Sequence, residues 1–164
     1  MTDRQTQMTP QPKAAKSSYS RAEWMTLLAE APVVELEAHW RSIPHPKFDW
    51  VRRPEYGSAM IRGRASGTGA QFNLGDVTVT RCTLQLETGE IGAAYVIGRD
   101  KRHAALAAIF DALALRDQVK QERTIQGLIA DLEHSRLARQ QAIAAETQTS
   151  KVDFTMLSRS EVSL

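Results

Sequence analysis

The spacing of apolar residues changes twice along this chain, and this change limits the folds that the chain can adopt. Apolar side chains recur every three to four positions near both ends, as in amphipathic helices. Between about residues 48 and 97 they tend to alternate every second position, as in half-buried strands. Strands joined mainly by hairpins and flanked by helices predict an α+β protein with an antiparallel sheet.

Two short helices are expected before the sheet. Ser20 and Glu23 have the spacing of a capping box, in which each side chain satisfies a free backbone N–H group. The helix that follows turns three apolar residues inward, namely Trp24, Leu27 and Leu28. Pro32 suits the first turn of a second helix, whose apolar stripe consists of Val33, Leu36, Trp40 and Ile43. The prolines of "IPHP" (43–46) end that helix.

About four strands are expected next. "FDWVRR" (48–53) and "AMIRGRA" (59–65) form a hairpin around the turn-like "PEYGS". Residues 65–76, "ASGTGAQFNLGD", are expected to form a loop whose glycines either adopt positive φ or approach an anion: Gly67, Gly69 and Gly75. "VTVTRCTLQLE" (77–87) slips phase near Thr80 and Arg81, which indicates either a bulge or a strand covered on both faces. After a tight turn, "IGAAYVI" is the returning strand.

Two more helices are expected after the sheet. Residues 98–115 form the first, with its apolar face made by Leu106, Ile109, Phe110 and Leu113. A longer helix runs from about 121 to 146, and its clearest stripe is Ile125, Leu128, Ile129 and Leu132. Its late part has few core residues, so we expect that part to lean on another protein.

Composition and length indicate one ordinary globular domain. The 164 residues are 42% hydrophobic and 24% charged, with a net charge of +2. We expect a flexible polar tail at 1–18, a single domain at 19–157 and a C-terminal tail at 158–164. Without a secretory signal or a long apolar run, the chain is expected to be cytoplasmic, with no membrane partner. The alternating residues Val152, Phe154 and Met156 are expected to pack on the domain's own sheet or to dock on a partner.

No self-sufficient active site is visible in the sequence. Cys82 is the only cysteine, which excludes an internal disulfide and a CxxC pair, and we expect it to be a buried apolar residue. The four histidines are scattered and form no metal-ligand spacing, so no metal is expected. Nothing combines a nucleophile, a base and an orienting group.

A set of basic residues is the main candidate for ligand binding. Cations at a helix start cost roughly 0.3–1 kcal/mol each unless something compensates them. The set, which the expected strand pairing could bring to one side of the sheet, consists of Arg62, Arg64, Arg81, Arg99, Lys101 and Arg102. A bound polyanion would relieve their repulsion. Alternatively, they point to water or pair with carboxylates of another chain.

Three stretches together resemble one protein family. They are "RGRASGTGAQFNLGDVTVTRC" (62–82), "LETGEIGAAYVIGRDKRHAALAAIFDAL" (86–113) and the terminal "KVDFTM". They are similar to the PhnG family, the small G subunit of the bacterial carbon–phosphorus lyase core complex. The strongest marks are Gly67, Gly69, Phe72, Gly75, Thr80, Arg81, Gly98, Arg99, Asp100, Ala104, Val152, Asp153 and Phe154. One departure is Thr155, where the family pattern would have a second aromatic residue after Phe154.

The resemblance implies a subunit of a complex that degrades organic phosphonates under phosphate limitation. Its partners would be the I, H and J subunits, the I subunit most directly. The complex would use MgATP as a substrate, release adenine and form ribose 1-methylphosphonate 5-triphosphate, while this chain would bind no cofactor itself. The resemblance implies a non-catalytic or assisting role, since no catalytic residue carries over. The alternative from the residues is a nucleic-acid-binding or other basic-surface module, for which a net charge of +2 gives little electrostatic drive.

Overall fold

The computed structural model describes residues 19–64, 69–120 and 123–149. Some expectations concern residues outside these ranges. They are the tail at 1–18, Gly67, the docking residues Val152, Phe154 and Met156, and the tail at 158–164.

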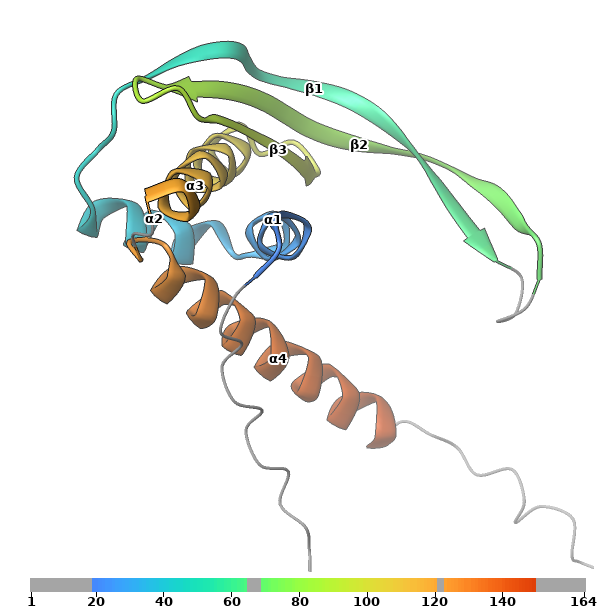
Figure 1. The fold of residues 1–164 in the computed structure, drawn as a ribbon. Helices are drawn as coiled ribbons and strands as arrows, with labels where there is room; N and C mark the ends of the chain where they lie inside the picture. Colours follow the sequence, from blue (N-terminus) through green and yellow to red (C-terminus); the bar gives the residue numbers. More distant parts are fainter. Residues whose placement is uncertain (1–18, 65–68, 121–122, 150–164) are drawn as a thin grey trace, which may run out of the picture.

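Four helices and a three-stranded antiparallel sheet make up the described fold. In chain order they are α1 (Arg21–Glu30), α2 (Val33–Ser42), β1 (Phe48–Arg64), β2 (Gln71–Leu86), β3 (Ile91–Ile97), α3 (Lys101–Lys120) and α4 (Gln126–Thr149). The strand order is β1-β2-β3. The helices lie on one side of the sheet, and β1 and β2 extend together well beyond β3 (Figure 1). The predicted α+β class, the antiparallel sheet and the two helices at each end are confirmed.

The expected strand count was too high by one. "PEYGS" does not turn, because β1 runs without interruption from Phe48 to Arg64. Pro54 is tolerated because β1 is an edge strand and the register with β2 shifts between Arg52 and Glu55. Gly57 leaves room for the Arg81 side chain, whose Nε would lie 3.5 Å from a Cβ at that glycine. Residues that usually mark a turn therefore occupy an irregular edge strand.

The expected glycine loop at 65–76 was also too long. Residues from Gln71 onward belong to β2 and pair with the end of β1. Gly75, expected in the loop, lies in the strand at φ +147°, where the register shifts between Ile61 and Arg62. The extra residue is Leu74, so this is a bulge in β2, and glycine accommodates its positive φ.

The core lies between the helices and the inner face of the sheet. Every apolar residue expected to face inward from α1, α3 and the start of α4 is buried. The sheet contributes Cys82, Leu84, Leu86, Ala94 and Val96. Val79 and Thr80 are both buried although they are consecutive, and the β2–β3 register is regular there. Of the two alternatives for the phase slip, β2 is thus buried on both faces at Val79 and Thr80, and the register shift beside Arg81 inserts its extra residue in β1 and not in β2.

A buried carboxylate ties three elements together beneath β3. Asp111 of α3 is 1% exposed and accepts hydrogen bonds from the Trp24 indole at 2.8 Å and from the Ala93 backbone N–H at 2.9 Å. It also forms an ion pair with Arg21 at 2.7 Å. Since Arg21 and Trp24 belong to α1 and Ala93 to β3, this residue fixes the position of α1 beside the sheet edge.

Candidate functional site

The outer part of the β1–β2 hairpin projects from the body as a two-stranded arm. β3 pairs with β2 only from Val79 to Gln85. Residues 58–64 and 71–78, which we call the arm, therefore form a ribbon that the third strand does not support (Figure 1). Isolated two-stranded ribbons are marginally stable in water. The arm is accordingly the part of the described fold that most needs an additional contact.

The arm carries an apolar face. Along β1, Ile61 and Gly63 share the side of the ribbon to which Glu55 and Arg81 belong, which is the sheet face without helices. Phe72 pairs with Gly63, and the Leu74 side chain lies where a Cβ at Gly63 would be, with Cδ1 only 2.4 Å away. Ile61, Phe72 and Leu74 are 40%, 47% and 60% exposed. They form an uncovered apolar strip that we call the outer face of the arm.

The opposite side of the arm is basic. Arg62 and Arg64 alternate with the apolar positions of β1, so they lie on the side that continues toward the helices. Their paired partners in β2 are Asn73 and Gln71, which are uncharged. This inner face of the arm also includes Met60, which is 59% exposed.

The structure divides the predicted basic set among several places. Arg81 lies on the outer side of the sheet and is paired with Glu55 at 3.0 Å, and Arg102 is paired with Glu37 of α2 at 3.2 Å. Lys101 lies over the Tyr56 ring, with Nζ 4.8 Å from its centre. Arg99 is exposed at the turn before α3. The six cations do not meet at one point in the described residues.

These contacts explain how α3 begins among cations. Asp100 accepts a hydrogen bond from the His103 backbone N–H at 2.8 Å and so supplies the carboxylate that a helix start favours. Glu37 and the Tyr56 ring compensate two of the cations. Groups within the chain therefore compensate the cations at the start of α3 without a bound anion. Arg62 lies far from this helix start, because Tyr56 and Arg62 are about 20 Å apart along an extended strand.

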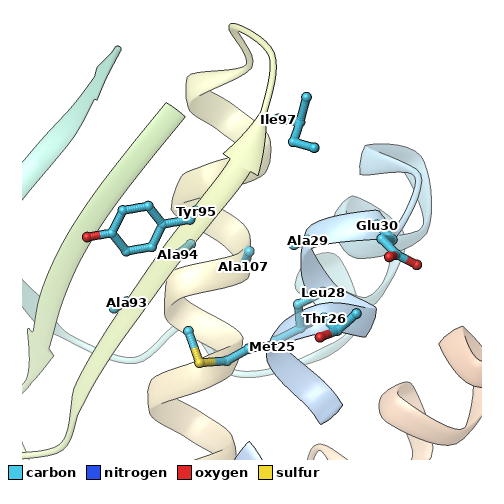
Figure 2. A pocket seen from close by; sticks show the side chains of 10 residues that line it. All are labelled: Met25, Thr26, Leu28, Ala29, Glu30, Ala93, Ala94, Tyr95, Ile97 and Ala107. Carbon is cyan, nitrogen blue, oxygen red and sulfur yellow. The ribbon is translucent and has the colours of Figure 1, made fainter. Parts of the chain in front are cut away.

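A groove lies between the outer edge of β3 and α1. It has a volume of about 560 Å³ and is lined by Met25, Thr26, Leu28, Ala29, Glu30, Ala93, Ala94, Tyr95, Ile97 and Ala107. Figure 2 shows these residues on β3, α1 and α3, with Met25 pointing from α1 toward the strand. The lining is mostly apolar, so the groove suits apolar side chains better than a charged ligand.

Some of the backbone hydrogen-bonding groups at the free edge of β3 have partners along this groove. In the β2–β3 ladder the even-numbered residues of β3 bond to β2, as the hydrogen bond from the Gly98 N–H to the Thr78 carbonyl at 2.9 Å indicates. The odd-numbered residues therefore direct their backbone groups to the free edge. There the Ile91 carbonyl accepts from Arg21 and the Ala93 N–H donates to Asp111. Within the described ranges, the backbone groups of Tyr95 and Ile97 at this edge have no such partner.

The lone thiol has no catalytic geometry. Cys82 is 1% exposed and donates a hydrogen bond to the Ala104 carbonyl at 3.1 Å. Burial raises the pKa of this thiol to about 11, so it stays protonated at neutral pH. The predicted buried role of Cys82 is confirmed. Over residues 19–64, 69–120 and 123–149, no three His, Cys, Asp or Glu residues are grouped to hold a metal ion, and no helix could cross a membrane.

Sequence patterns alone did not reveal the arm or the groove. Phe72 and Leu74 alternate as strand residues do, but the surrounding glycines favoured a loop. The groove depends on how α1 packs against β3, which no local pattern encodes. Of the predicted glycines, Gly69 lies just before β2 and Gly75 lies within it.

The fold and these surfaces define a small α+β protein with a projecting two-stranded arm that carries an exposed apolar strip. Comparisons with known proteins identify the family to which this chain belongs. The model of the family described as "Phosphonate metabolism protein PhnG" matches residues 19–160. The chain is also 40% identical, over 142 residues, to the α-D-ribose 1-methylphosphonate 5-triphosphate synthase subunit PhnG of Rhizobium meliloti (strain 1021). That similarity covers 86% of this chain and 90% of the relative. The chain belongs to the PhnG family.

Proposed function

We propose that this chain is an assisting subunit of an α-D-ribose 1-methylphosphonate 5-triphosphate synthase that acts in phosphonate catabolism. The observation that carries the proposal is the 40% identity, across nearly the full length of both chains, to a relative named as that subunit. The family match does not favour the alternative of a nucleic-acid-binding module.

The proposed reaction joins a phosphonate to the ribose of MgATP and releases adenine. In this proposal the I and H subunits are partners in that step, and the J subunit acts on the product within the same cytoplasmic complex. The described residues of this chain supply docking surface, and the reacting groups belong to the I subunit. An exposed arm supports this division of roles, because apolar strips of this kind mark interaction sites.

Loss of the arm's apolar face tests the docking role. We expect the double variant Ile61→Asp, Leu74→Asp to fold but to lose co-purification with the I subunit at high ionic strength. Carboxylates there would remain charged against an apolar partner, and salt would not rescue the contact. The control is Val51→Asp, at a 63% exposed position nearer the other end of β1. Equal recovery of the complex with the double variant would contradict the docking role of the arm.

A direct role for the basic residues is a second proposal, which the position of Arg62 and Arg64 favours. They have uncharged paired neighbours on the inner face of the arm, whereas Arg81 and Arg102 are already paired within the chain. In this proposal Arg62, Arg64 and the exposed Arg99 neutralise the triphosphate or phosphonate at the border with the I subunit.

Kinetics of the assembled complex test this second proposal. We expect Arg99→Ala and the double variant Arg62→Ala, Arg64→Ala to raise the KM for MgATP about tenfold, the size of one lost charged hydrogen bond. The control is Arg41→Ala, whose guanidinium lies on α2 and pairs with Glu37. An unchanged KM and kcat in a fully assembled complex would contradict the proposal.

A further inference from the structure

We propose that the groove beside β3 binds residues 151–157 of a second copy of this chain, as a strand added to the sheet edge. The inference concerns self-association and does not depend on the proposed function. It rests on the chemistry of the groove, the free backbone groups of β3 and the position at which α4 ends.

The groove and the segment have matching chemistry. The sequence "KVDFTML" alternates, so an extended segment presents Val152, Phe154 and Met156 on one side. The groove floor offers apolar contacts for that side from Met25, Leu28, Ala29 and Ala107. The other side carries Lys151, Asp153 and Thr155, which suits exposure to water. A segment that was apolar on both sides would not fit this half-open groove as well.

The edge of β3 offers the backbone contacts that an added strand uses. Arg21 and Asp111 already satisfy the edge at Ile91 and Ala93, where α1 lies against the strand. Tyr95 and Ile97, at the open end of the groove, direct their backbone groups outward without such partners in the described structure. Strand addition would satisfy them and would cover Ile97, which is 76% exposed.

The length of α4 argues against the chain filling its own groove. Arg136 of α4 is paired at 2.9 Å with Glu30, which lines the groove. From Arg136 to its end at Thr149, α4 rises about 20 Å, at roughly 1.5 Å per residue. Val152 is only three residues beyond Thr149, so even a fully extended chain could bring it back toward the groove by only about 10 Å. Val152 of the same chain would therefore stay about 10 Å short of Glu30, so the three apolar residues would not fill their own groove together. A second copy is not subject to this limit.

The segment is also part of what the family shares. The family match continues to residue 160, beyond the end of α4 at Thr149. The N-terminal residues before 19 lie outside it. Two copies that exchange C-terminal segments would form a closed symmetric dimer, in which each groove is filled once.

Disulfide trapping in the full-length chain tests the proposal directly. The variant Ile97→Cys, Phe154→Cys is made in a Cys82→Ala background, so that only the two new thiols react. We expect mild oxidation to give a disulfide-linked dimer, which peptide mass mapping assigns to positions 97 and 154. The matched control is Val51→Cys, Phe154→Cys, with an exposed position on the far strand of the sheet. A disulfide within one chain, or equal cross-linking in the control, would overturn the proposal.

Molecular mass in solution provides an independent measurement without new cysteines. We expect the wild type to sediment as a dimer and Phe154→Asp to sediment as a folded monomer. Thr155→Asp, on the opposite side of the segment, should remain a dimer. A monomeric wild type would overturn the exchange even if the chain still assembles with the I subunit, so this failure is distinct from failure of the proposed function.

Discussion

At the scale of single residues, Asp111 is the polar group on which the arrangement of α1, β3 and α3 most depends. We expect Asp111→Ala to lower the free energy of unfolding by about 3 kcal/mol, because it leaves the Trp24 indole and the Ala93 N–H without their acceptor. Urea denaturation measures the change. The control is Asp49→Ala, at an exposed position of β1, which should stay within about 0.5 kcal/mol of the wild type. Equal stability of both variants would contradict this role of Asp111.

His39 should make the fold sensitive to acid. Burial lowers the pKa of its ring below the ordinary value of 6.5, against a smaller opposing effect of Asp131. Its Nε2 atom is buried without a hydrogen-bond partner in the described structure, and the ring meets the Phe110 ring edge-on at 5.7 Å. The unfolded chain therefore binds the proton more readily. The stability that neutral His39 provides is present above pH 6.5 and is lost as the pH falls toward the folded-state pKa.

The measurement is the free energy of unfolding of the wild type and His39→Gln between about pH 5 and pH 8, a range that spans the ordinary pKa of histidine. The wild type should lose stability on the acid side, and the glutamine variant should lose less. His45→Gln, at an exposed position, is the control and should keep the wild-type dependence. If His39→Gln has the same pH dependence as the wild type, His39 is not the group responsible.

At the scale of elements, helices were predictable and the strands less so. The apolar stripes of α3 and α4 repeat over about two turns, and α1 begins at a capping box, so local patterns were sufficient to find these helices. In β1 the pattern is broken by Pro54 and Gly57, whose roles depend on the neighbouring strand. Turn residues were therefore interpreted locally, and one long strand was predicted as two.

The contact between β3 and α3 depends on the absence of a side chain. A Cβ at Gly92 would lie 2.0 Å from the Ala108 carbonyl oxygen and 2.7 Å from the Ala112 Cβ. We expect Gly92→Ala to cost about 3 kcal/mol of stability, because the helix backbone must move away from the sheet. Chemical denaturation measures this cost.

Gly127→Ala is the matched control for that substitution. Gly127 lies in the first turn of α4, and a Cβ there meets nothing within 4 Å. Alanine should therefore be neutral or should stabilise the helix by about 0.5 kcal/mol. A loss at position 92 no larger than the change at position 127 would contradict the close packing of α3 on β3.

At the scale of the whole molecule, the arm follows from unequal strand lengths. β1 and β2 span 17 and 16 residues, whereas β3 spans 7, so the third strand cannot cover the hairpin to its end. The sequence indicated leftover amphipathic surface but not its position, because the register between distant strands places Ile61 beside Phe72 and Leu74. The basic residues illustrate the same limit, because Arg62 and Arg81 lie on opposite faces of the sheet and Arg81 is already paired with Glu55.

This geometry predicts that the arm and the body are separable. Replacing residues 60–76 by Asn-Gly would join Ala59 directly to Val77, which are paired in the hairpin, through a favoured two-residue turn. The core lies between the helices and the part of the sheet that β3 supports, so the melting temperature should change by only a few degrees, equivalent to about 1 kcal/mol. The shortened chain should nevertheless lose co-purification with the I subunit, because the strip formed by Ile61, Phe72 and Leu74 is gone. A shortened chain that unfolds would show that the arm supports the core, and one that still assembles would place the interface elsewhere.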